Sequence, residues 1–76
     1  TTKEKEKISA LVKVYSTMKP KDAARIFNTL DLEITTALVR EMKPSTSSAI
    51  ISQMDAAKAK EITDALIGNS LNNSGE

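Results

Sequence analysis

The sequence repeats itself after 24 residues, and this repeat restricts the fold more than any other feature. Five positions carry the same residue at both ends of the offset: Met18 and Met42, Lys19 and Lys43, Pro20 and Pro44, Ile26 and Ile50, Asp31 and Asp55. Each unit reads as a short helix, a turn with an aspartate and a second short helix. One such unit cannot bury its apolar side by itself, whereas two stacked units share a core.

Apolar residues recur at helical spacing in five segments. The segments are 1–18, 20–30, 32–42, 45–54 and 56–67. Their predicted core-facing residues are Ile8, Leu11, Val12, Tyr15, Met18, Ala23, Ile26, Phe27, Leu30, Ile34, Ala37, Leu38, Met42, Ile50, Ile51, Met54, Ala59, Ile62 and Leu66. The sequence therefore predicts an all-α fold, a right-handed superhelical stack of about five short helices built from helical-hairpin repeats.

Five residues are predicted to set the helix boundaries. Pro20 and Pro44 force the preceding lysine out of the helical region and suit the first position of the next helix. Asp31 and Asp55 are predicted N-caps, whose carboxylates accept the free amides of the following turn. Gly68 is the predicted C-terminal stop. Residues 1–67 thus form a single domain, and the polar segment 68–76 is predicted to be a disordered tail.

The composition excludes most catalytic chemistry. The 76 residues include no cysteine and no histidine, which removes disulfides, thiolate nucleophiles, cysteine-histidine zinc sites and the commonest general base. The only glycines are Gly68 and Gly75, so no glycine-rich phosphate loop exists. Ser45, Ser47 and Ser48 are interpreted as helix-capping hydroxyls. We expect no enzyme activity, no metal site and no cofactor.

Charged residues leave one nucleic-acid alternative open. Lys21, Arg25, Arg40 and Lys43, with Lys19, could form a basic edge, and short helices with tight turns are typical of small DNA-binding modules. Acidic residues lie between these cations, and the net charge is only +1. A solvated surface is the favoured interpretation, and DNA binding is the weakest alternative.

The segment Leu11–Asp31, LVKVYSTMKPKDAARIFNTLD, resembles the C-terminal domain of MotE-type flagellar proteins. These belong to the broader group built on the MgtE intracellular N-domain repeat, which the motor-switch protein FliG also resembles. The likeness continues through ALVREMKP and SAIISQMDAAKAKEITDAL, and it spans about Leu11 to Leu66. The Ser/Thr-rich STSSA departs from the charged helix start that is common in the repeat.

The MotE resemblance implies a non-enzymatic protein-interaction domain in a periplasmic flagellar chaperone, which stabilises a MotC-like motility protein. We predict rim contacts from Lys21, Arg25, Arg40 and Lys43. The charged start of segment 1–18 could be the end of an upstream coiled coil through which the protein self-associates. No direct membrane insertion is expected.

The MgtE resemblance keeps another alternative open. In it the chain is a cytoplasmic Mg²⁺-sensing domain of a magnesium transporter, although the acidic crowding of that family is missing here.

Overall fold

The repeat seen in the sequence is present in the backbone. The structure is a computed structural model that describes the backbone of residues 2–75 and the side chains of residues 2–68. Its five helices are α1 (Thr2–Ser16), α2 (Pro20–Phe27), α3 (Leu32–Glu41), α4 (Pro44–Ile51) and α5 (Ala56–Gly75). Helices α2 and α4 begin and end 24 residues apart, and α3 and α5 begin at the same offset. No strand occurs in residues 2–75, so the predicted all-α class is confirmed.

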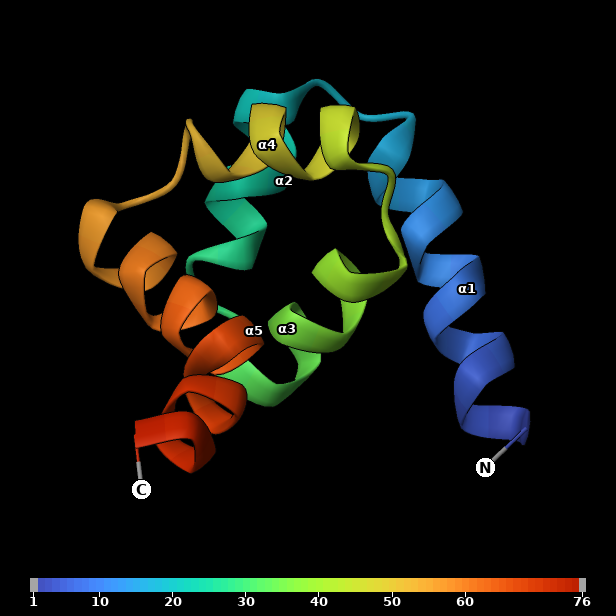
Figure 1. Ribbon diagram of the computed structural model, residues 1–76. Helices are drawn as coiled ribbons and strands as arrows, with labels where there is room; N and C mark the ends of the chain where they lie inside the picture. The colour runs from blue at the N-terminus through green and yellow to red at the C-terminus, as the bar shows by residue number, and fades with distance from the viewer. Residues whose placement is uncertain (1, 76) are drawn as a thin grey trace.

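The helices stack in two layers (Figure 1). Helix α3 packs between α1 and α5, while α2 packs on α4. Every helix therefore contacts the helix two places along the chain, which is the pattern expected for stacked repeat units. The right-handed superhelical course of the stack stays a prediction.

The two prolines set the helix boundaries as predicted. Pro20 and Pro44 each occupy the first position of a helix, and the preceding Lys19 and Lys43 are extended with ψ of 136° and 144°. In both units the lysine carbonyl then accepts from the amides three and four residues later, at 2.9 to 3.0 Å. The Lys-Pro pair is therefore a backbone device that ends one helix and starts the next.

The predictions for Asp31 and for Gly68 need correction. Asp31 stands at the N-cap of α3, but its carboxylate makes no capping hydrogen bond. Its carbonyl oxygen instead accepts from the Thr35 amide at 3.0 Å and from the Thr35 hydroxyl at 2.9 Å. Because Asp31 is exposed, water solvates the carboxylate. Asp55 has the equivalent position ahead of α5, where its carbonyl accepts from the Ala59 amide at 2.9 Å.

Gly68 does not stop α5, which continues to Gly75. The offset explains the correction, since Gly68 occupies the position of Pro20 and Pro44 in a third copy. Glycine keeps its amide and places no restriction on the residue before it, so the helix passes through. The predicted disordered tail at 68–76 falls mainly on residues whose side chains lie outside the described part, and it stays a prediction.

The serine-capping interpretation is also corrected. The Ser47 hydroxyl donates to the Pro44 carbonyl at 3.3 Å, and the Ser48 hydroxyl donates to the Ser45 carbonyl at 3.2 Å. These hydroxyls bond back along the helix and do not accept its free amides.

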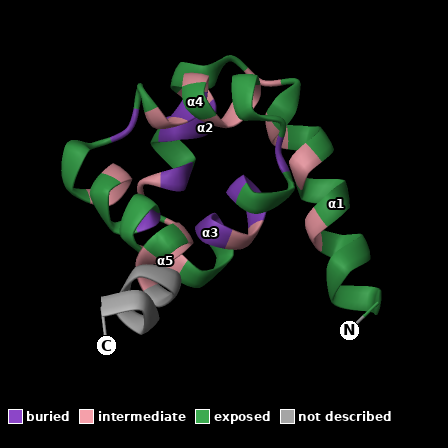
Figure 2. Ribbon diagram, in the orientation of Figure 1, coloured by how far each residue is buried: buried purple, intermediate pink, exposed green. Residues whose placement is uncertain are grey.

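The core lies between the two layers (Figure 2). Its buried apolar residues are Ala23, Ala24, Phe27, Leu38, Val39, Met42, Ile50, Met54 and Ile62. The Tyr15 ring packs edge-on against Phe27, with ring centroids 5.2 Å apart. Helix α1 contains no buried residue and covers this core with half-buried side chains. Leu11, Ile26 and Ile34, all predicted to face the core, are instead exposed.

Two contacts join the first unit to the second. The Asp55 amide donates to Asn28 Oδ1 at 3.1 Å, which links the two interhelical turns. Lys58 Nζ donates to the Leu30 carbonyl at 2.6 Å. Both bonds tie the α2–α3 turn to the start of α5, so they fix how the units stack.

Candidate interaction groove

A groove runs along the outer side of α3, and Ala37 lies at its centre. Three adjoining hollows of about 240, 320 and 330 Å³ make up this groove, and Ala37 lines all of them. Two hollows lie between α1 and α3, and the third lies between α3 and α5. Ala37 is a short side chain, whereas its repeat equivalents are the long Lys13 of α1 and Glu61 of α5.

The floor of the groove between α1 and α3 is apolar. Ile8 and Ala37 are half-buried, and Ile34 is 41% exposed. An exposed isoleucine between two helices leaves apolar surface in contact with water, and covering that surface is favourable. The groove is therefore better suited to an apolar segment than to a polar small molecule.

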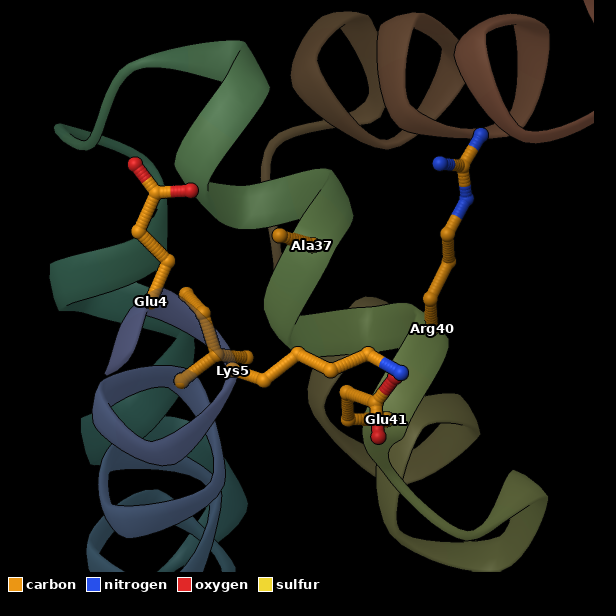
Figure 3. Close-up of a pocket in the computed structure, with 6 residues that line it drawn as sticks. Glu4, Lys5, Ala37, Arg40 and Glu41 are labelled. Atoms are coloured by element: carbon orange, nitrogen blue, oxygen red, sulfur yellow. The ribbon is translucent and has the colours of Figure 1, made fainter. Parts of the chain in front are cut away.

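The rim of the groove carries charges of both signs. Glu4, Lys5 and Lys7 come from α1, while Glu33, Arg40 and Glu41 come from α3. Figure 3 shows Lys5 and Glu41 extending toward each other across the opening, while Arg40 extends away toward α5. A rim with three acidic and three basic groups is unlike the uniformly positive surface that binds a phosphate backbone.

The hollow between α3 and α5 contains a buried hydroxyl without a partner. Thr36 Oγ1 is inaccessible to solvent and makes no hydrogen bond, and Thr36 and Arg40 line the same hollow. An unsatisfied buried hydroxyl has a free-energy cost that a bound amide or carbonyl would remove. Because the atom is closed off from the hollow, its hydrogen-bonding capacity stays unmet among the described residues.

The four predicted rim residues do not all meet in this groove. Arg40 lines it, whereas Lys43 is the N-cap of α4. Lys21 and Arg25 are exposed on α2, in the other layer, where Arg25 lies 3.9 Å from Asp22. The predicted basic edge is thus divided between the two layers.

Sequence reasoning missed the apolar floor. It placed Ile34 and Ala37 in the core, although the offset pairs Ile34 with the polar Lys58 and Ala37 with Glu61. The large core residue Leu38, in contrast, keeps an apolar partner at this offset in Ile62. That difference was the available signal.

The described residues offer no metal centre and no membrane span. No cluster of three or more His, Cys, Asp or Glu side chains in this part of the chain is arranged to hold an ion. Among the same residues, no helix has both the length and the apolar character that crossing a membrane requires.

One comparison with known proteins gives a result. A family model described as the MgtE intracellular N domain matches residues 6–68, which is most of the chain. The searches of curated proteins and of solved structures gave no match. The match confirms the broader resemblance seen in the sequence and leaves the MotE-like part of it as a prediction. The MgtE N domain is a helical, non-enzymatic domain associated with magnesium transporters, in agreement with the absence of catalysis expected from the composition.

Proposed function

Because this chain belongs to the MgtE intracellular N domain family, we propose that it is a non-catalytic interaction domain whose groove on α3 holds a segment of a partner protein. The observation that carries the proposal is the apolar floor of Ile8, Ile34 and Ala37, open to water inside a charged rim.

The groove chemistry indicates the kind of segment that fits. Apolar side chains would cover Ile34 and lie against Ala37, in hollows of about 240 to 330 Å³. Alternating charges on the segment would pair with the rim, and such rim charges mainly fix orientation and partner choice.

A charge placed at Ala37 tests the groove. Ala37→Arg puts a long cation into the centre of the apolar floor and is expected to abolish partner binding. Ala57→Arg is the matched control, since Ala57 is an exposed alanine on α5 outside the three hollows. Both variants are first checked for helicity by circular dichroism. Equal binding by the two folded variants would refute the groove as the binding surface.

The narrower proposal for the partner is a MotC-like flagellar motility protein, which the chain would stabilise as a periplasmic chaperone. Its support is the MotE-like text of the first unit, Leu11–Asp31. Co-purification with the candidate motility protein, followed by the Ala37→Arg comparison, tests this assignment. A stable complex is expected, and none at micromolar concentrations of both proteins would refute it.

The alternative is a cytoplasmic Mg²⁺-sensing domain, and its support is the association of the family with magnesium transporters. In that case Mg²⁺ would shift amide resonances near the turn carboxylates Asp31 and Asp55. The dispersed carboxylates of the described residues argue for the interaction domain instead, because Mg²⁺ needs converging oxygen ligands. A magnesium titration followed by NMR separates the two proposals, and saturable shifts at these aspartates would favour the sensor.

A further inference from the structure

Helix α1 supplies no buried residue to the core of this protein. The nine buried apolar residues of the core all lie between Ala23 and Ile62. None of the 15 residues of α1 is buried, whereas α3, with 10 residues, contains four buried ones. Helix α1 therefore covers the core from outside, and the buried side chains come from the four helices that follow it.

The docking of α1 is concentrated near its C-terminal end. Val12, Tyr15 and Met18 are half-buried against the core, and the Tyr15 ring makes the edge-on contact with Phe27. Nearer its N-terminus, hollows of about 240 and 320 Å³ lie between α1 and α3, and Ile8 lines both of them. Figure 1 shows α1 at one edge of the stack beside α3. Its attachment is thus strongest next to the connection to α2.

The connection between α1 and α2 has the properties of a hinge. The amides of Thr17 and Met18 donate at 3.3 and 3.2 Å to carbonyls three residues earlier, within α1 itself. Lys19 is extended, and its carbonyl accepts from two amides of α2. A residue before proline tolerates a wide range of φ within the extended region. A change in φ at Lys19 would therefore move α1 without breaking the bonds that start α2.

The contacts that hold the two units together do not involve α1. The Asp55 amide bonds to Asn28, and Lys58 bonds to the Leu30 carbonyl. Helix α2 packs on α4, and α3 packs on α5. Helices α2 to α5 can therefore remain folded while α1 leaves, which is an opening of one part of the structure.

Helix α1 needs its docked position to stay helical. An isolated helix of its 15 residues is marginal in water, because nucleation is costly and most helical stability in proteins comes from packing of an apolar face. Undocking removes the cover from Ile8, Val12 and Tyr15 together. The amides of α1 should therefore become free to exchange with solvent as one group.

We propose that α1 is a hinged wall of the groove on α3, which docks and undocks as one unit while α2 to α5 remain folded. Docked α1 brings Ile8 to the same hollow as Ile34, so this part of the groove exists only in the docked state. The proposal rests on the proposed function of the groove and adds its regulation. A partner segment that fills the hollows between α1 and α3 binds the docked state and shifts α1 toward it.

Native-state hydrogen exchange at several urea concentrations tests the proposal on the free chain. We expect the amides of residues 8–16 to share one opening constant, at least about tenfold larger than the opening constant at Leu38. Their opening should also depend less on urea than the opening at Leu38, because undocking exposes less surface than global unfolding.

Two kinds of variant separate undocking of α1 from global unfolding. Ile62→Val changes α5, which α3 separates from α1, and should raise the opening constant at Leu38 about fivefold. The opening constant of α1 should change less than about twofold in the same variant.

Tyr15→Ala removes the contact with Phe27 and should raise the opening constant of α1 at least about tenfold. Val14→Ala is the matched control, because Val14 is the adjacent residue and is 52% exposed, and its effect should stay below about threefold.

Two results in the wild-type chain would overturn the proposal. One is an α1 that opens only together with Leu38, with equal opening constants and equal urea dependence. The other is exchange that slows gradually from Thr2 onward without urea dependence, which is the behaviour of a docked helix that frays.

The regulatory part is tested in the complex sought above by co-purification. There the amides of α1 should exchange at least about tenfold more slowly than in the free chain. An unchanged rate in a stable complex would refute the regulation and leave the proposed function intact. Loss of all binding would refute the proposed function and the regulation with it, whereas the free chain decides the hinge independently.

Discussion

The matched isoleucines Ile26 and Ile50 give the most direct test of the stacking argument. Both occupy the seventh position of an eight-residue helix that begins with proline, and both helices end in closely similar backbone conformations at Asn28 and Ser52. Substitution by alanine therefore changes helix propensity equally at the two sites, and that contribution cancels in the comparison. What differs is the surrounding protein.

The burial of each residue sets the expected cost. At Ile50 the substitution removes three fully buried carbon atoms, worth about 2.4 kcal/mol at about 0.8 kcal/mol per methylene. The cavity raises the loss in unfolding free energy to about 3 kcal/mol, within the measured range for such changes. At Ile26 about a third of the side chain already meets water, and water fills the space that is left. There we expect a loss of about 1 kcal/mol.

Urea denaturation followed by circular dichroism measures both losses. A chain of this length should have a total stability of about 4–11 kcal/mol, so Ile50→Ala remains measurable unless the wild type lies at the lower limit. In that case Ile50→Val, with an expected loss of about 1 kcal/mol, replaces it. Equal losses at the two sites, or a larger loss at Ile26, would refute the stacking argument.

Three further predictions concern single contacts. Gly68→Ala should raise the unfolding free energy by about 0.4–1 kcal/mol, because Gly68 is helical, has no positive φ and has open space around its Cβ position. A lower unfolding free energy in urea denaturation would restore Gly68 as a helix stop. Asn28→Ala should lower the unfolding free energy by about 1 kcal/mol, because the Asp55 amide loses its acceptor. Asn28→Asp keeps an acceptor and should lower it less in the same assay. Identical losses in the two variants would argue against that hydrogen bond. Stability should be constant across neutral pH, because the chain has no histidine. The Asp64 carboxylate raises the pKa of Lys60 above 10.5, so the contribution of that ion pair is present below 10.5 and is lost as pH rises through the raised value; a thermal transition that moves within neutral pH would contradict this.

The helix boundaries at the prolines were predictable because they depend on local chemistry. Proline restricts the residue before it wherever it occurs, so Lys19 and Lys43 adopt the same extended conformation. The N-cap at Asp31 was predictable in position but not in bonding. A carboxylate that is open to water can cap or remain solvated at nearly the same free energy, and sequence does not decide between the two.

The groove and the exposure of Ile26 depend on position within the stack, which helical periodicity does not report. Ile26 and Ile50 have the same helical phase, and only their rank along the stack separates a core residue from a surface one. Ile34 shows the opposite case, since it fits a helical stripe but stands at a position that is polar in the second unit. Reading periodicity together with the repeat offset would have identified it.

Repeat symmetry also indicates where function should be sought in a chain this small. Leu38 and Ile62 are apolar in both units and lie in the shared core. Ala37 differs from its equivalents Lys13 and Glu61, so the open surface around it is the first place to seek a partner contact.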